Sequence, residues 1–307
     1  MELVTLADVR AAAALIAPAV VRTPLLRFDE GLWLKPESLQ PVGAFKLRGA
    51  YHALARLPED VRARGVVAYS SGNHAQAVAY AAKLFGVPAT IVVPDTAPRV
   101  KVEATRSHGA RVVEVPVVER ETRAHELAAS LGATLVPPFD HPDVIAGQGT
   151  IGLELVADLP EVATVLVPVS GGGLISGVAA AVKALSPATR VVGVEPELAG
   201  DTAASFRAGE LVRWPAADRV RTAADGLRAE PSPLTFAHVL AHVDDVVTVP
   251  EDAIAAAVRL LAFRSRLVVE PSGAVTLAAY LASPTPRTAA VVSGGNVDPT
   301  TLLPLLT

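Results

Sequence analysis

The chain has 307 residues, enough for one large or two medium domains, and its high hydrophobic and low aromatic fractions are typical of helices covering a parallel sheet. The net charge is −4 without a basic stripe, and no apolar run is long enough to span a bilayer, so neither nucleic acid nor a membrane is expected as a partner. The N-terminus shows no secretory signal and the chain has no cysteine, which excludes disulfides and thiol catalysis and predicts a cytoplasmic protein.

Short β-branched runs alternate with alanine-rich helical stretches along the chain. A capping box at Thr5 opens the first helix, which we expect to end before Pro18. The later predicted helices cover residues 46–55, 75–85, 99–107, 121–131 and 174–185, and Gly86 ends the second of these. The predicted strands cover residues 32–35, 66–69, 89–93, 111–115, 134–136, 164–169, 191–194 and 289–292.

This alternation predicts an α/β fold, because right-handed βαβ crossovers produce parallel sheets covered by helices. We expect two open, mostly parallel, twisted sheets, each flanked by helices. Residues 60–141 are predicted to form a small domain inserted in a large one, which comprises residues 1–59 and 142–307.

Three loops of unusual composition follow predicted strands. Residues 70–74 read SSGNH, residues 170–174 read SGGGL and residues 293–296 read SGGN. Exposed amides at the start of a helix suit a carboxylate, and consecutive glycines let amides approach a phosphate closely. Each loop taken singly is more often a tight turn, and the second loop has neither dinucleotide-binding nor Walker spacing. Three of them at the carboxyl ends of strands indicate a ligand site, because open α/β sheets bind ligands there.

One of the five lysines stands apart from the others. Lys46 lies between Phe45 and the start of a predicted helix, in the segment GAFKLRGA. Burial there would lower the pKa of its amine and leave a neutral nucleophile able to attack an aldehyde cofactor. We expect the arginines and Asp244-Asp245 to be solvated. The remaining lysines, Lys35, Lys83, Lys101 and Lys183, are expected to have solvated or snorkelling side chains.

These loops, in this order, resemble those of the fold-type II pyridoxal-phosphate (PLP) family, in its serine/threonine dehydratase and serine racemase branch. The likeness covers essentially the whole chain and includes residues 144–150 (VIAGQGT), 224–226 (ADG) and 269–273 (VEPSG). Any one segment is weak, but the ordered set is specific. The resemblance implies the fold of the tryptophan synthase β-subunit, a small amino-acid substrate and a homodimer.

The resemblance also implies roles for individual residues. Lys46 would bind the cofactor aldehyde covalently, and Phe45 would pack against the pyridine ring. Substrate carboxylate binding is implied for the first loop, which consists of Ser70, Ser71, Gly72, Asn73 and His74. Phosphate binding is implied for the second loop, which consists of Ser170, Gly171, Gly172, Gly173 and Leu174. Many family members have glycine in place of Ser170.

Four residues are implied to surround the cofactor ring. Asn73 would contact its phenolic oxygen and Ser293 its pyridine nitrogen, while Gly226 and Glu270 would line the pocket. A serine does not keep the pyridine nitrogen protonated, which weakens the ring as an electron sink and favours early loss of a β-hydroxyl group.

The implied activity is an ammonia-lyase (dehydratase) that converts L-threonine to 2-oxobutanoate and L-serine to pyruvate, with release of ammonia. Lys46 would be the general base at the substrate Cα. Ser71 leaves serine racemase open as an alternative, because a second acid/base group on the opposite face could return a proton; otherwise it caps the following helix or lines the pocket. L-threo-3-hydroxyaspartate dehydratase fits the same residues. A non-catalytic protein that binds an amino acid or PLP is the alternative from another class.

A possible metal site follows a predicted strand. The resemblance implies that Glu195, the Ala199 carbonyl and Asp201 bind a divalent cation, and such oxygen ligands suit Mg²⁺ or Ca²⁺. An acidic surface loop is the alternative. His238 and His242 share a helix face but lack the glutamate of the HExxH motif, so we expect a surface or packing role rather than zinc binding.

Overall fold

The computed structural model describes residues 2–307. The α-helices are α1 Leu6–Ile16, α2 Lys46–Arg56, α3 Glu59–Ala63, α4 Asn73–Phe85, α5 Arg99–Ser107, α6 Arg120–Leu131, α7 Pro142–Asp158, α8 Gly173–Leu185, α9 Asp201–Ala208, α10 Ala216–Arg219, α11 Pro233–His242, α12 Glu251–Ser265, α13 Pro271–Ala282 and α14 Pro299–Leu306. The 3-10 helices are η1 Glu37–Leu39, η2 Val117–Glu119, η3 Glu197–Ala199 and η4 Asp225–Leu227. The strands are β1 Leu26–Arg27, β2 Leu32–Pro36, β3 Val66–Tyr69, β4 Ala89–Pro94, β5 Arg111–Val115, β6 Thr134–Leu135, β7 Thr164–Pro168, β8 Arg190–Pro196, β9 Asp245–Val249 and β10 Thr288–Val292.

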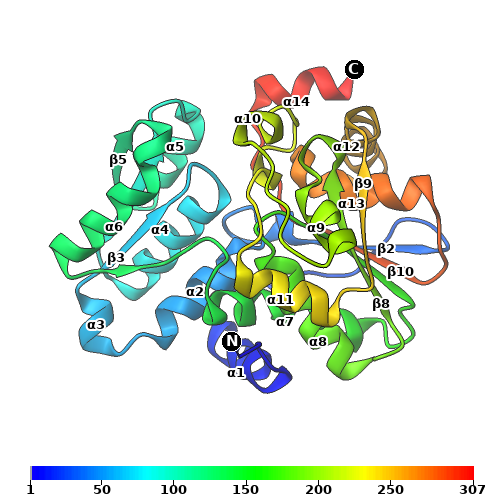
Figure 1. The fold of residues 1–307 in the computed structure, drawn as a ribbon, viewed down its shortest axis with the longest axis horizontal. Helices are drawn as coiled ribbons and strands as arrows, with labels where there is room; N and C mark the ends of the chain where they lie inside the picture. The colour runs from blue at the N-terminus through cyan, green and yellow to red at the C-terminus, as the bar shows by residue number, and fades with distance from the viewer. Residues whose placement is uncertain (1) are drawn as a thin grey trace.

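The strands form two separate sheets, as the alternation of strands and helices predicts. The larger sheet has six strands in the order β1-β2-β10-β7-β8-β9, and all neighbours are parallel except β1 and β2. The smaller sheet has four parallel strands in the order β5-β4-β3-β6. Figure 1 shows the two sheets in different parts of the molecule, with α2 between them.

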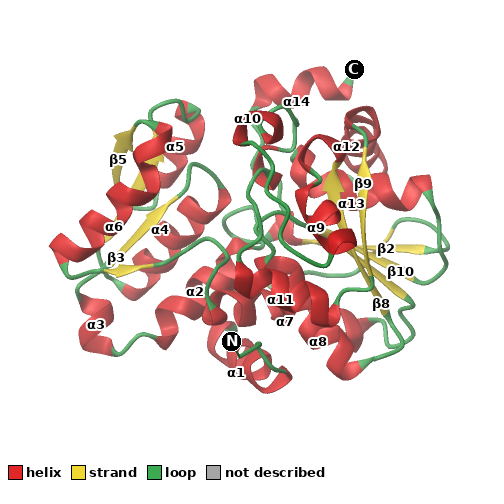
Figure 2. Ribbon diagram, in the orientation of Figure 1, coloured by secondary structure: helices red, strands yellow, loops and turns green. Residues whose placement is uncertain are grey.

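Helices cover both faces of the larger sheet. Alternate residues of each strand point to opposite sides, and the apolar residues on each side pack against a different set of helices. In β10, Ala290 and Val292 pack against α12 and α13, whereas Ala289 and Val291 pack against α7, α8 and α11. Figure 2 shows helices on both sides of this sheet. Both faces are therefore buried, which explains why the inner strands β7 and β10 read as continuous apolar runs.

The smaller sheet is covered in the same way. Val66 and Ala68 of β3 pack against α2 and α4, and Val67 between them packs against α6. Residues 66–135, which contain all four strands with α4, α5 and α6, are called the small-sheet unit below. The domain boundaries at residues 60 and 141 stay a prediction.

Two helix ends confirm local signals in the sequence. The Thr5 hydroxyl accepts a hydrogen bond from the Asp8 amide at 3.3 Å, and the Asp8 carboxylate accepts one from the Thr5 amide at 2.8 Å, which forms the predicted capping box. Gly86 ends α4 with φ of +66°, a conformation that few residues other than glycine adopt. Within residues 2–307, every helix is too short or too polar to cross a bilayer.

Candidate active site

Lys46 is the first residue of α2, where the loop after η1 turns into the helix. Its side chain is half-buried and its Nζ donates a hydrogen bond to the carbonyl oxygen of Pro138 at 2.6 Å. Burial lowers the pKa of the amine to about 8. A substantial fraction of the amine is thus neutral near physiological pH, as its position in the sequence predicts.

The loop of residues 70–74 leads from β3 into α4. Gly72 is the N-cap of α4, and no side chain caps the helix, so the positive end of α4 remains available to an anion. The Ser71 side chain is half-buried and forms no hydrogen bond with residues 2–307, so Ser71 does not cap the helix. His74 is buried, its Nε2 lies 2.9 Å from the Val136 carbonyl, and burial together with the nearby Lys46 lowers its pKa to about 3. The imidazole is therefore neutral.

Asn73 connects this loop to two distant segments. Its side-chain amide donates to Glu270 Oε1 at 2.6 Å, and its Oδ1 accepts from Asn296 Nδ2 at 2.8 Å. Burial, with a further contribution from the charge of Asp225, raises the pKa of Glu270 to about 7. These contacts bring Asn73 and Glu270 together, as expected for residues around one ring.

The glycine loop of residues 170–174 leads from β7 into α8. Gly172 has φ of +85°, and a Cβ on Gly171 would lie 2.3 Å from the ring of Phe139, so both positions require glycine. No side chain caps α8 and its first turn has no acidic residue, which leaves an uncovered positive helix end beside the glycines. The Ser170 hydroxyl donates to the Ala229 carbonyl at 3.1 Å, so its side chain stabilises the loop.

Ser293 follows β10 and lies close to Lys46 in space. Its carbonyl accepts a hydrogen bond from the Phe45 amide at 3.0 Å. Its side chain is buried, and among residues 2–307 the hydroxyl reaches only the Ser272 carbonyl at 3.5 Å, which is long for such a bond. The Gly226 amide donates to the Ser272 hydroxyl at 2.9 Å, which places Gly226 next to the same segment. A buried hydroxyl with such a weak contact is suited to a ligand.

The three loops thus converge around Lys46, and two residues that the sequence did not single out complete the site. Pro138 accepts from Lys46, and Phe139 packs against the glycine loop. Asn296, at the end of the third loop, fixes Asn73. The turn PPFD at residues 137–140 directly after a strand was the available signal for the first two.

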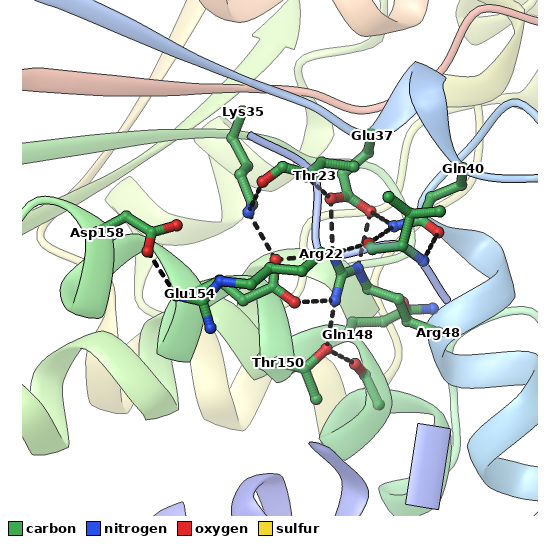
Figure 3. A network of polar contacts seen from close by, with 12 residues as sticks. Arg22, Thr23, Lys35, Glu37, Gln40, Arg48, Gln148, Thr150, Glu154 and Asp158 are labelled. Atoms are coloured by element: carbon green, nitrogen blue, oxygen red, sulfur yellow. Dashed lines mark hydrogen bonds and ion pairs between the residues drawn. The ribbon is translucent and has the colours of Figure 1, made fainter. Parts of the chain in front are cut away.

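Arg48, two residues after Lys46 in α2, is the centre of a buried ionic network (Figure 3). The Arg48 guanidinium contacts both carboxylate oxygens of Glu37, at 2.8 and 2.9 Å, and both of Glu154, at 2.7 and 2.9 Å. Lys35 Nζ contacts Glu154 and the Thr23 carbonyl, each at 2.6 Å. Lys35 and Arg48 are fully buried, so the expectation of solvated side chains is wrong for both. Periodicity placed Lys35 on a strand but could not show that acidic partners surround it.

The profile of the family described as "Pyridoxal-phosphate dependent enzyme" matches residues 16–294 of this chain. The chain belongs to this PLP-dependent enzyme family. Serine racemase from Oryza sativa subsp. indica is 43% identical over 95% of this chain and 90% of its own. L-threo-3-hydroxyaspartate ammonia-lyase from Saccharomyces cerevisiae is 41% identical over 96% and 94%. L-threonine ammonia-lyase from Thermotoga maritima is 45% identical over 96% and 76%.

Solved structures support the same family assignment. Maize serine racemase superposes with a TM-score of 0.94 at 41% identity, covering 98% of this chain and 96% of its own. The T.th. threonine deaminase has a TM-score of 0.91 at 46% identity, with 96% and 99% covered. The fold is therefore that of the fold-type II PLP enzymes, as the resemblance implied.

The residues present fit the family's cofactor. PLP needs an amine for its aldehyde, an anion cradle for its phosphate and polar partners for its ring. Lys46 has a pKa lowered to about 8, the glycine loop at α8 forms a cradle that a Cβ would fill, and Ser293 has a weakly bonded buried hydroxyl. These are features of the chain itself, independent of the comparisons.

A second polar cluster lies at the end of β8. Glu195 and Asp201 are buried, and neither carboxylate oxygen of Asp201 has a hydrogen-bond partner among residues 2–307. Burial, with the charge of Asp201, raises the pKa of Glu195 to about 8, and burial raises that of Asp201 to about 6. This is the arrangement that a cation would stabilise, and it is no surface loop. The described residues contain no group of three or more His, Cys, Asp or Glu side chains that could hold a metal, so a cation here would also need the Ala199 carbonyl or water.

The remaining polar candidates are structural. His238 is buried and its Nε2 accepts a hydrogen bond from the Val4 amide at 2.9 Å, which confirms a packing role. Asp244 is exposed and Asp245 partly exposed, as expected for a solvated face, and Asp244 also pairs with Lys183 at 2.7 Å and accepts from the Val191 amide. Lys101 is partly exposed and paired with Asp225, in agreement with a snorkelling side chain, and Lys83 is exposed as predicted.

Proposed function

We propose that the protein is a PLP-dependent ammonia-lyase acting on L-threonine and L-serine. The observation that carries the proposal is the half-buried amine of Lys46, with its pKa lowered to about 8, at the meeting point of three ligand-binding loops. Relatives named L-threonine ammonia-lyase and L-threo-3-hydroxyaspartate ammonia-lyase support an elimination reaction.

The chain's own residues divide the work of the reaction. The uncapped start of α4 at Gly72 binds the substrate carboxylate, and Asn73, fixed by Glu270 and Asn296, orients the ring. The amides at the start of α8 hold the phosphate. Bound PLP supplies an electron sink for the bond electrons of the substrate Cα. Ser293 leaves this sink weak, so loss of the β-hydroxyl group soon after proton removal is favoured.

Lys46 removes the proton from Cα. Its lowered pKa keeps a neutral amine available, and its hydrogen bond to Pro138 shows that Nζ is held by the segment that also supports the glycine loop. The hydroxyl group takes up a proton and leaves Cβ as water. The remaining enamine then reacts with water to give the 2-oxo acid and ammonia. L-threonine thereby gives 2-oxobutanoate and L-serine gives pyruvate.

Product analysis of the purified PLP-loaded enzyme tests the proposal. We expect steady keto-acid release from L-threonine and L-serine, and Lys46→Ala should lower it at least about 1000-fold. Lys83→Ala, which changes an exposed lysine on α4, is the matched control and should retain the wild-type rate. A protein that binds PLP and amino acid but releases no keto acid would be a binding protein. Release from L-threo-3-hydroxyaspartate alone would assign the substrate to that alternative.

Serine racemase is the second candidate, and Ser71 favours it. Its hydroxyl neither caps α4 nor bonds to any of residues 2–307, so it is available to exchange a proton with a substrate. Serine racemases are also among the similar proteins. Chiral chromatography that shows mainly D-serine formed from L-serine would assign this activity.

Two further proposals follow from the family and from the buried carboxylates. Glu195, Asp201 and the Ala199 carbonyl bind Mg²⁺ or Ca²⁺, because Asp201 is buried beside Glu195 and neither of its carboxylate oxygens has a hydrogen-bond partner among residues 2–307. The enzyme acts as a homodimer in the cytoplasm, which sedimentation and cell fractionation test.

A further inference from the structure

Lys101 joins the small-sheet unit to the opposite part of the chain. It lies in the first turn of α5, and its Nζ pairs with the Asp225 carboxylate in η4. Of the ion pairs formed among residues 2–307, this is the only one that joins α4, α5 or α6 to a residue beyond 142. Figure 1 shows α5 at the upper end of the small-sheet unit, away from α2.

Lys101 does not stabilise its own helix, but it is well placed to pair with Asp225 of η4. A cation in the first turn opposes the helix dipole, and α5 has no acidic residue there to offset it. The side chain is nevertheless held in place, with 13% of it exposed, against 40% for Asp225. On the same helix, Val102 and Thr105 are buried, so α5 is packed against the core of the small-sheet unit and Lys101 is fixed to that unit.

Asp225 stands next to the ring pocket of the proposed active site. The following residue, Gly226, bonds to the Ser272 hydroxyl at 2.9 Å. Burial and Asp225 raise the pKa of Glu270, and Lys101 lowers it, so both charges lie near enough to act on that carboxyl group. The ion pair therefore lies near the contact of Asn73 with Glu270.

We propose that Lys101 is a positioning residue, whose pair with Asp225 holds the small-sheet unit closed over the ring pocket and keeps Asn73 against Glu270. The inference rests on the proposed function, because closure serves to exclude water and to complete the site around the substrate. Loss of the pair lowers the fraction of closed molecules, and the apparent substrate affinity falls in the same proportion.

The variants are chosen to remove only the charge of this bridge. Lys101→Met keeps the length of the side chain, Lys101→Arg keeps its charge, and Lys83→Met is the control on an exposed lysine of the same unit. Lys101 is changed rather than Asp225, because Asp298 offers Lys101 a second partner: the hydrogen bonds of Thr300, and to a smaller extent the charge of Lys101, lower the pKa of Asp298. The double variant Lys101→Glu with Asp225→Lys reverses the pair, and thermal melting checks that each variant is folded.

Steady-state kinetics of the PLP-loaded enzyme give the first measurement. In Lys101→Met we expect the KM for L-threonine to rise about fivefold and kcat to change less than about twofold. The wild-type kcat/KM should fall as salt rises from about 0.05 to 0.5 M, whereas that of Lys101→Met should stay constant, because salt screens an ion pair. Lys101→Arg and the reversed pair should approach the wild type. An unchanged KM in Lys101→Met overturns the proposal.

Amide hydrogen exchange gives a second measurement that needs no turnover. In Lys101→Met the amides of α5 and η4 should exchange about fivefold faster than in the wild type, and Lys83→Met should leave them unchanged. Equal exchange in Lys101→Met and the wild type overturns the proposal even if the enzyme is active. If the wild type releases no keto acid but the amides of α5 and η4 still exchange faster in Lys101→Met than in the wild type, the proposed function is refuted and the bridge is supported.

Discussion

The proposed role of Ser71 concerns which product the site forms, because its half-buried hydroxyl does not cap α4 and forms no hydrogen bond with residues 2–307. In Ser71→Ala we expect any D-serine formation to fall at least about 100-fold, since a general acid or base typically contributes that factor. Keto-acid release should change less than about threefold, because we propose Lys46, and not Ser71, as the base for elimination. Chiral chromatography and a keto-acid assay on the same sample measure both products.

The neighbouring hydroxyl provides the control. Ser70 accepts a hydrogen bond from the Gly72 amide at 3.3 Å, so its side chain supports the loop. Ser70→Ala should lower both products by a similar factor through weaker substrate binding. A Ser71→Ala enzyme that loses elimination and racemisation together would show that Ser71 positions the substrate and does not transfer a proton.

At the residue scale, the sequence distinguishes lysines by their local neighbours but not by their distant ones. Lys46 could be singled out because Phe45 and a helix start adjoin it in the chain. Lys35 could not, because its carboxylate partner is Glu154, more than a hundred residues away. The roles proposed for Lys46, Ser71 and Ser293 still rest on the resemblance and remain predictions.

At the scale of elements, Arg48 anchors α2. Its guanidinium lies between Glu37 of η1 and Glu154 of α7 and pairs with both carboxylates. Arg48→Met removes one side of a buried ionic network and leaves Glu37 without its main partner. We expect the free energy of unfolding to fall by about 3–5 kcal/mol, measured by urea denaturation. Arg22→Met, which breaks the exposed pair with Asp158, should cost less than about 1 kcal/mol.

The pH dependence of this loss follows from Glu37. Burial raises the pKa of Glu37, but the charge and hydrogen bonds of Arg48 outweigh burial and hold it below the ordinary value of 4.5. The stabilisation is therefore present above that pH and is lost as the pH falls through the lowered pKa. The difference between wild type and Arg48→Met should shrink in acid, and a constant difference would contradict this assignment.

Helix α7 shows why some elements could not be predicted. It contains Gly147, Gly149 and Gly152, and glycine inside a helix is unfavourable, so the local sequence argues against a helix there. Packing overrides this preference. A Cβ on Gly147 would lie 2.6 Å from the Arg48 carbonyl, and one on Gly149 would lie 2.8 Å from the Gly177 carbonyl. The glycines let α2 and α8 approach α7 closely, which is a tertiary property.

At the scale of the whole molecule, the alternation of strands and helices was sufficient to predict two parallel sheets. The order of strands in each sheet was not predicted, because it depends on pairings between distant segments, such as β10 with β2 and β7. The same pairing brings Ser293 next to Phe45. The contact of Asn73 with Asn296 likewise joins the small-sheet unit to the last loop and has no local signal.

The buried carboxylates at the end of β8 predict that the stability of the whole molecule depends on a divalent cation. A cation bound at 100 times its Kd would stabilise the folded state by about 2.7 kcal/mol. For a chain of this size, that corresponds to a rise of Tm by about 4–5 °C. We expect Mg²⁺ or Ca²⁺ to produce such a rise after treatment with a chelator, measured by calorimetry.

Two variants of the same loop separate specific binding from a general salt effect. Asp201→Asn removes a buried carboxylate without a hydrogen-bond partner among residues 2–307 and should abolish the rise of Tm. Glu197→Gln changes an exposed carboxylate between the proposed ligands and should leave the rise intact. If Asp201→Asn responds to the cation as the wild type does, the ion binds elsewhere, and the raised pKa values of Glu195 and Asp201 then indicate that the pair shares protons instead.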